Sequence, residues 1–118
     1  MTKRERLPNE RKSLTHKFCV ADQEGYLTVG LFEDGRPGEL FIHISKEGST
    51  VSGLMDVVGI LTSLALQHGV SLADITRKLK KTRFEPYGRT QNKEIPEATS
   101  LVDYIFRWLE MKFGKEKA

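Results

Sequence analysis

One stretch of the chain, residues 82–96, gathers side chains that together suit a flat, negatively charged ligand. Pro86, Gly88 and Pro96 interrupt both the helical and the strand period, so the stretch is predicted to be a long loop. Loops of this length inside a compact domain usually carry function. The candidate binding residues are two aromatic, three basic and one amide side chain: Phe84, Tyr87, Arg83, Arg89, Lys93 and Asn92.

Each of these residue types has a part in binding a nucleotide. Aromatic rings stack on a base, and guanidinium or ammonium groups hold phosphate. A side-chain amide hydrogen-bonds the edge of a base or a ribose. The loop therefore predicts a pocket for a nucleotide or a cyclic nucleotide. The alternative is that the two rings only pin the loop to the core while the charges are solvated.

A second place for an anion is the start of the long helix predicted after residue 50. Ser49 and Thr50 are candidate ligand-binding residues there, because free N–H groups at a helix N-terminus favour anions. The phosphate-loop pattern is not matched, since Leu54 and Met55 occupy the positions that require Lys and Ser or Thr. Ser49 or Thr50 as an ordinary N-cap is the better interpretation.

The composition limits the class of protein. With 118 residues, 38% apolar and 30% charged, the chain suits a globular domain with a modest core. It contains no run of about 18 apolar residues and no apolar stretch of the kind found in a signal peptide. We therefore expect a cytoplasmic protein without a membrane span.

Catalytic and metal-binding patterns are not evident in the sequence. Cys19 is the single cysteine, which excludes an internal disulfide and a cysteine-based zinc site. No nucleophile has a recognisable base and orienting group, and the three histidines are spread over different predicted elements. We expect no catalytic residues, no metal and no cofactor, and hence a protein that is not an enzyme on its own.

The net charge of +3 is distributed unevenly. Residues 77–93 carry seven basic and one acidic side chain, and residues 1–14 carry five and two. Concentrated positive charge attracts phosphate, although it also serves solubility. Residues 1–14 show no apolar period and are predicted to be a basic arm, so that residues 15–118 form a single domain.

The predicted fold class is α+β, with a three-stranded antiparallel meander followed by three helices packed on one face in two layers. Two-residue alternation predicts strands, and three- and four-residue spacing predicts helices. The strands are expected at Thr15–Ala21, Tyr26–Glu33 and Glu39–Ser45, and the helices at Val51–His68, Leu72–Lys80 and Glu97–Phe113. Gly69 and Gly114 are the expected helix stops.

Two apolar surfaces predict that the chain associates with itself. The second face of the meander carries Tyr26, Phe32, Phe41 and His43, which is more apolar than a wetted face needs to be. The first helix is expected to be the central core helix, and the third helix has more apolar surface than one neighbour covers. We expect a homodimer or a higher homo-oligomer.

Several runs of the sequence resemble the C-terminal region of adenosylcobalamin (vitamin B12)-dependent ribonucleotide reductases, which contains a module named TSCPD after its motif. The runs cover most of the chain: residues 6–11, 15–18, 24–31, 46–56, 82–86 and 103–109. The resemblance implies a stand-alone version of that module, possible association with a reductase catalytic subunit, and no part of the barrel, cobalamin site or radical cysteines.

A second likeness concerns size and expected architecture alone. Small phage anti-defence proteins that sequester cyclic nucleotide or cyclic ADP-ribose immune signals have a similar length and an aromatic, basic pocket. The leading hypothesis is a non-catalytic nucleotide-binding module. A phage-type sponge for immune signals and an interaction or oligomerisation module without a ligand are the alternatives.

Overall fold

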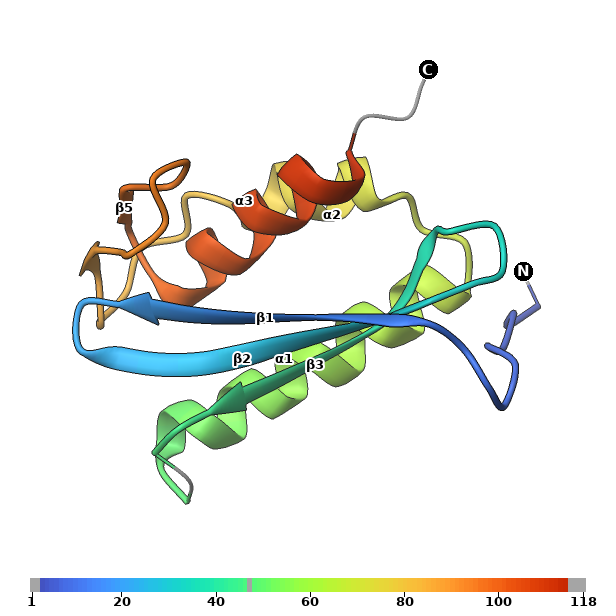
Figure 1. Ribbon diagram of the computed structural model, residues 1–118, viewed down its shortest axis with the longest axis horizontal. Coiled ribbons are helices and arrows are strands. Elements are labelled where there is room, and N and C mark those ends of the chain that lie inside the picture. The colour runs from blue at the N-terminus through green and yellow to red at the C-terminus, as the bar shows by residue number, and fades with distance from the viewer. Residues whose placement is uncertain (1–2, 47, 115–118) are drawn as a thin grey trace. The chain divides into compact units, whose positions relative to one another are not determined.

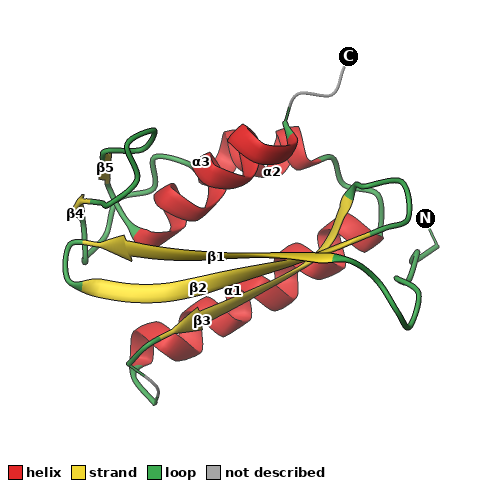
Figure 2. Cartoon of the chain, viewed as in Figure 1, coloured by secondary structure: helices red, strands yellow, loops and turns green. Residues whose placement is uncertain are grey.

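A computed structural model describes residues 3–46 and 48–114 of the chain. It has a three-stranded antiparallel sheet followed by helices, which confirms the α+β prediction (Figure 2). The elements in chain order are β1 (Ser13–Val20), β2 (Gln23–Leu31), β3 (Pro37–Ile44), α1 (Thr50–Gln67), α2 (Leu72–Leu79), β4 (Gly88–Arg89), β5 (Glu97–Ala98) and α3 (Leu101–Phe113). They form two compact units: Met1–Lys17 with Gly25–Ser71, and Phe18–Glu24 with Leu72–Ala118.

The first unit contains the pairing of β2 with β3, whose register separates the residues of the two faces. Tyr26 lies opposite His43 and Thr28 opposite Phe41. The rings of Tyr26 and Phe41 are 42% and 56% exposed, so the second face of the sheet is open and aromatic, as predicted. The alternate positions are buried: Leu27, Val29, Leu40, Ile42 and Ile44.

Phe32 departs from the prediction, because it is buried rather than on the open aromatic face. The register shifts between Gly30 and Leu31, just before it. The Arg36 guanidinium lies 4.5 Å from the centre of the Phe32 ring. Gly38 is also against this ring, since a Cβ on Gly38 would lie 2.7 Å from it. The turn through residues 34–36 thus folds Phe32 inward.

Helix α1 runs along β3 at the edge of the sheet (Figure 1). Ser63 Oγ accepts the Leu40 N–H at 2.8 Å, and Gln67 Nε2 donates to the Gly38 carbonyl at 2.8 Å. A Cβ on Gly59 would lie 2.9 Å from the Leu40 carbonyl oxygen, so the helix approaches the strand backbone closely. The helix thereby covers the unpaired backbone groups of an edge strand.

The prediction that this first helix is the central core helix is wrong. Only Met55, Gly59, Thr62 and Gln67 of α1 are buried. Gly59 and Ser63 face β3, because at these two positions the contact is with the strand backbone at Leu40. The apolar stripe that the sequence assigned to the core is instead on the open side: Leu54, Val57, Leu61 and Leu64 are all exposed.

Among residues 3–46 and 48–114, one helix, Thr50–Gln67, is long and apolar enough by length and composition to cross a membrane. The expectation from sequence concerned an uninterrupted run of about 18 apolar residues, and Ser52, Asp56 and Gln67 interrupt such a run in this helix. One helix of this length and composition does not by itself assign a membrane.

Helix α3 is the core helix of the second unit. Eight of its residues are buried: Leu101, Val102, Asp103, Tyr104, Ile105, Phe106, Trp108 and Leu109. Phe18 stacks on Tyr104 with ring centroids 5.4 Å apart, and the Lys80 ammonium binds Glu110 at 2.9 Å, which ties α2 to α3. The surplus apolar surface predicted for this helix is therefore used inside the chain.

The start of α3 also differs from the prediction, which placed it at Glu97 after Pro96. Residues 97 and 98 form β5 instead. Ser100 is the N-cap, and its hydroxyl accepts the Asp103 N–H at 2.9 Å. A Ser three residues before an Asp outweighs Pro96 as a start signal, since it satisfies a free N–H group. The expected stops hold, because α1 ends before Gly69 and α3 before Gly114.

Described residues of the predicted basic arm are hydrogen-bonded to other residues of the first unit. Arg4 Nε donates to Gln67 Oε1 at 2.7 Å, and the Glu5 N–H donates to the Gln67 carbonyl at 2.7 Å. Further along, Arg11 binds Glu39 through two nitrogens at 2.7 and 3.0 Å. Two of the arm's five basic residues thus have partners within the protein.

Candidate functional site

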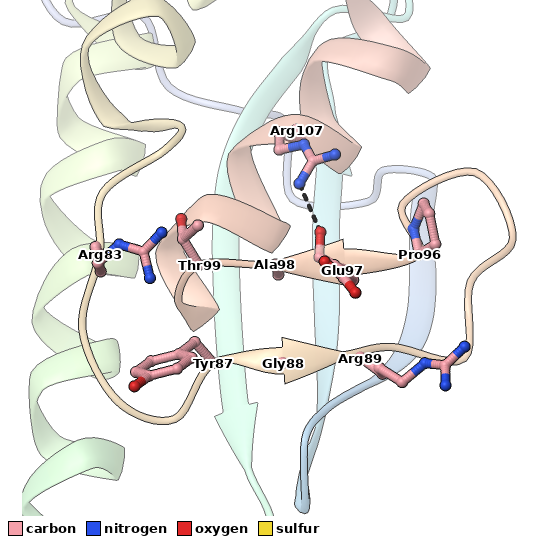
Figure 3. A pocket seen from close by; sticks show the side chains of 9 residues that line it. All are labelled: Arg83, Tyr87, Gly88, Arg89, Pro96, Glu97, Ala98, Thr99 and Arg107. Carbon is pink, nitrogen blue, oxygen red and sulfur yellow. Dashed lines mark hydrogen bonds between the residues drawn. The ribbon is translucent and has the colours of Figure 1, made fainter.

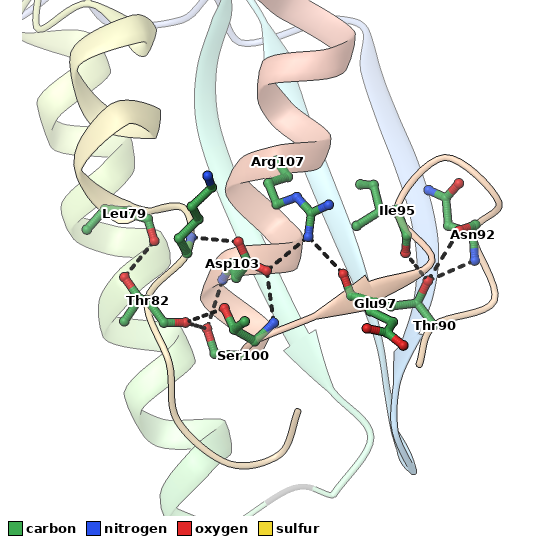
Figure 4. Close-up of polar contacts among 11 residues, drawn as sticks. Leu79, Thr82, Thr90, Asn92, Ile95, Glu97, Ser100, Asp103 and Arg107 are labelled. Carbon is green, nitrogen blue, oxygen red and sulfur yellow. Dashed lines mark hydrogen bonds and ion pairs between the residues drawn. The ribbon is translucent and has the colours of Figure 1, made fainter. Parts of the chain in front are cut away.

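The long loop between α2 and α3 is closed at its base by a buried carboxylate. Asp103 Oδ1 accepts the Lys81 N–H at 2.6 Å, and Oδ2 accepts the Thr99 N–H at 2.9 Å (Figure 4). The Thr82 carbonyl oxygen accepts the hydroxyls of both Thr99 and Ser100. One side chain of α3 therefore holds both ends of the loop together.

The same contacts determine the ionisation of Asp103. This residue is only 1% exposed. Burial raises the pKa of its carboxyl, but the Thr99 and Lys81 N–H groups and the Arg107 guanidinium outweigh burial and hold that pKa below its ordinary value. Asp103 is thus a charged anchor at neutral pH.

Next to this base the loop contains a short ladder between its own strands β4 and β5, and β4 is also bonded to the tip of the β1–β2 hairpin. Gly88 pairs with Ala98 and Arg89 with Glu97. On the other side of β4, the Ala21 N–H donates to the Arg89 carbonyl at 2.9 Å. The predicted irregular loop therefore contains a two-stranded sheet, which fixes the backbone on both sides of Arg89.

Asn92 organises the turn between β4 and β5. Its Oδ1 accepts the Glu94 N–H at 2.9 Å, and its Nδ2 donates to the Tyr104 hydroxyl at 3.0 Å. The Thr90 hydroxyl donates to the Ile95 carbonyl in the same turn. The Asn92 amide thus has internal partners on both of its polar atoms.

A pocket of about 500 Å³ opens over this ladder. Its lining contains three arginine side chains and one tyrosine side chain, which come from the loop before β4, from β4 and from α3 (Figure 3). The lining residues are Arg83, Tyr87, Gly88, Arg89, Pro96, Glu97, Ala98, Thr99 and Arg107. Its volume lies within the range of small-molecule sites, about 300–1,000 Å³. Three guanidiniums against one carboxylate make the lining positive.

Tyr87 and Arg83 act as a pair at one end of the pocket. The Arg83 guanidinium lies 5.7 Å from the centre of the Tyr87 ring, within the range of a cation–π contact. The ring remains 49% exposed, so part of its surface can accept a flat group. Arg89 lies toward the other end and Arg107 reaches in from α3 (Figure 3).

The structure brings together three of the eight ligand-binding residues predicted from sequence. Arg83, Tyr87 and Arg89 line the pocket, whereas Phe84, Asn92 and Lys93 do not. Phe84 is 37% exposed elsewhere on the loop. Ser49 and Thr50 belong to the other compact unit, and Ser49 is the N-cap of α1, with its hydroxyl accepting the Ser52 N–H at 3.1 Å.

Arg107 is a pocket residue that sequence reasoning missed. Its Nη1 donates to the Glu97 carbonyl at 2.8 Å and contacts Asp103 Oδ2 at 3.1 Å (Figures 3 and 4). The sequence feature that could have identified Arg107 is its four-residue spacing from Asp103 on one helix, which places an acidic and a basic side chain side by side. That spacing identifies an ion pair, but only the folded loop brings it to the pocket.

The pocket contains the groups for holding an anion and none of the usual pairs for nucleophilic catalysis. Within residues 3–46 and 48–114, no cluster of three His, Cys, Asp or Glu side chains suits a metal ion. What the lining offers chemically is charge-assisted hydrogen bonding from guanidiniums beside an aromatic face.

The chain matches the model of the TSCPD domain over residues 2–113. It is also similar to vitamin B12-dependent ribonucleotide reductases of several bacteria. The identity is 59% over 111 residues for the protein of Rhodopirellula baltica, 44% over 110 residues for Streptomyces avermitilis, and 43% over 111 residues for Agrobacterium fabrum.

These matches cover 94%, 93% and 93% of this chain but 11%, 11% and 9% of the respective reductases. The chain thus spans about a tenth of the length of these relatives. No solved structure matches it significantly.

Proposed function

We propose that this chain, which belongs to the TSCPD domain family, is a non-catalytic module that binds a nucleotide in the pocket between β4, β5 and α3. The observation that carries the proposal is that Arg83, Tyr87 and Arg89 line one open pocket. Family membership alone carries no ligand, because function belongs to the site rather than to the fold.

The phosphate of the ligand is held by arginine in this proposal. The guanidinium is always charged and offers several N–H donors in a plane, which suits the oxygens of a phosphate. Arg107 is already bonded to Asp103 and to the Glu97 carbonyl. Arg83 and Arg89 are therefore the principal phosphate ligands, and Arg107 contributes charge from a fixed position.

The base of the ligand stacks on Tyr87. Its ring is half exposed beside the Arg83 guanidinium, so a base can lie against the ring while its phosphate meets the arginine. Base–aromatic stacking contributes about 1–3 kcal/mol. The Glu97 carboxylate in the lining favours a ligand whose ring carries N–H donors, and it disfavours a simple polyanion.

In the reductases, this region is one part of a much longer chain. The proposed place of this chain is an accessory module that binds a nucleotide beside a B12-dependent reductase catalytic subunit. Cyclic nucleotide signals also combine a ring with phosphate. The titration below therefore has to distinguish linear nucleotides from cyclic nucleotide signals.

The test is calorimetric titration of the whole chain with nucleoside mono-, di- and triphosphates, cyclic nucleotides and cyclic ADP-ribose. At least one of them is expected to bind. Arg89→Gln is expected to weaken binding about 10- to 100-fold, since a hydrogen bond to a charged group contributes about 1.5–3 kcal/mol. Tyr87→Ala is expected to weaken it by a similar factor, and Tyr87→Phe to leave it nearly unchanged.

Lys93→Gln is the matched control, because Lys93 is an exposed cation of the same loop outside the pocket lining. It removes the same charge and is expected to change affinity less than threefold at physiological salt. Equal weakening by Lys93→Gln and Arg89→Gln would show diffuse attraction rather than a site. Absence of binding by the folded wild-type protein to every ligand of the panel would refute the proposal.

A further inference from the structure

The open side of α1 carries an apolar seam with the spacing of a coiled coil. Leu54, Val57, Leu61 and Leu64 follow a 3-4-3 spacing, which places them in one stripe along the helix. Their exposed fractions are 59%, 48%, 60% and 37%. Four large aliphatic side chains in one exposed stripe are unusual for a surface without a partner.

The seam is not needed for the packing of α1 inside the first unit. The helix uses its opposite side for β3, with Gly59 against the Leu40 carbonyl and Ser63 bonded to the Leu40 N–H. Met55 and Thr62 are buried on that side as well. Substitutions in the seam should therefore leave the packing on β3 intact.

The positions beside the seam carry no charge. One flank consists of Gly53, Ile60 and Gln67, and the other of Val51, Val58 and Ala65. In coiled coils, charges at these flanking positions choose the partner and repel the wrong one. Here nothing on the flanks would repel an identical helix.

The apolar surface extends beyond the seam toward the sheet. Phe41 of β3 and Ile60 of α1, 56% and 59% exposed, line one groove together with Leu64. Together with the seam they add exposed apolar side chains to the surface that a partner could cover.

We infer that this seam is the interface of a symmetric dimer, in which α1 pairs with α1 of a second copy in antiparallel orientation. A twofold axis near the middle of the seam places Leu54 opposite Leu64 of the partner copy and Val57 opposite Leu61 of the partner copy. Each pair joins two aliphatic side chains, so one stripe is complementary to itself, as an isologous contact requires.

Two other occupants fit the seam less well. A membrane core disfavours Asp56, an exposed residue of α1 outside the seam and its two flanks, because a carboxylate near the bilayer centre costs about 2.5–3.5 kcal/mol. A helix of a different protein would commonly be selected by charges beside the seam, and α1 has none at those positions. A second copy needs only the residues already present.

The test is sedimentation equilibrium of the whole chain over a concentration series. The wild type is expected to be dimeric, and Leu61→Glu is expected to raise the dimer dissociation constant at least about 100-fold, since it leaves an unpaired carboxylate in an apolar interface. Val70→Glu is the matched control, because Val70 is 44% exposed but lies beyond the end of α1. It should leave the dimer unchanged.

Crosslinking adds a readout of proximity between the two copies of α1. In a Cys19→Ser background, Ile60→Cys places a single thiol close to the proposed axis, and a short thiol crosslinker is expected to give covalent dimers. Glu33→Cys, an exposed position on the turn before β3, should give few. Circular dichroism confirms that each variant is folded.

A wild type that stays monomeric up to about 1 mM would overturn the inference, as would a dimer that survives Leu61→Glu. Flotation of the monomer with lipid vesicles, or its binding to a B12-dependent reductase through the seam without self-association, would assign the seam to another occupant. Arg83→Gln and Arg89→Gln lie outside the seam and should not affect the dimer, so this inference stands or fails independently of nucleotide binding.

Discussion

The two long helices of this protein are both apolar, but they use their apolar residues in opposite ways. Helix α3 buries eight of its 13 residues, including Trp108 and Phe106. Helix α1 has 18 residues and buries four, of which Gly59, Thr62 and Gln67 are small or polar. Leu54, Leu61 and Leu64 of α1 lie on the open side.

The difference shows that an apolar stripe does not by itself identify the face that packs. Helix α3 packs against side chains such as Phe18, so large residues fill the space. Helix α1 packs against strand backbone, where Gly59 and Ser63 allow close approach and hydrogen bonding. Four of its large aliphatic residues therefore lie exposed on the open side, while α3 supplies the anchor of the pocket loop.

The strongest test of this contrast is truncation of one large side chain on each helix. Phe106→Ala removes a fully buried ring from α3 and is expected to lower the free energy of unfolding by about 3–5 kcal/mol. Leu61→Ala on α1, where the side chain is 60% exposed, should change it by less than about 0.5 kcal/mol in a monomer. Urea denaturation measures both, and equal losses would contradict the assignment of the core to α3.

A second test concerns Asp103, the buried carboxylate by which α3 holds the two ends of the pocket loop. Asp103→Asn puts an NH₂ group against an N–H donor at the base of the loop, and it is expected to cost about 2–3 kcal/mol at pH 7. The proposed nucleotide affinity should fall with it.

The pH dependence of the same variant follows from the lowered pKa of Asp103. A carboxyl whose folded pKa lies below its unfolded value near 3.9 stabilises the fold above that value, and the stabilisation is lost as pH falls through the folded pKa. The stability gap between wild type and Asp103→Asn should therefore be constant above about pH 5 and shrink below pH 4. A gap independent of pH would mean that Asp103 acts without its charge.

The third and smallest effect compares two glycines of α1. A Cβ on Gly59 would lie 2.9 Å from the Leu40 carbonyl oxygen, so Gly59→Ala is expected to destabilise by about 1–3 kcal/mol. At Gly53 a Cβ would meet no atom within 4 Å, and Gly53→Ala should stabilise by about 0.5–1 kcal/mol through helix propensity. Thermal unfolding of the two variants should shift in opposite directions.

The candidate site could be predicted from sequence to the extent that its residues are adjacent in the chain. Arg83, Tyr87 and Arg89 were found because they share one loop with prolines and glycines. Lys93 has the same chemistry, but the turn fixed by Asn92 leaves it outside the pocket lining. Arg107 was missed because it reaches the pocket from a helix that is distant in sequence.

The amino-acid sequence by itself determined the three long strands and the three helices, because alternation, helical spacing and terminal residues such as Gly69 and Gly114 act over a few neighbours. It also determined the family through runs that extend along most of the chain. Only the tertiary structure decided which side of α1 packs, where α3 begins and which cations share a pocket. Those outcomes depend on contacts between residues distant in sequence, such as Gly59 with Leu40 and Asp103 with Lys81, whose geometry no local period encodes.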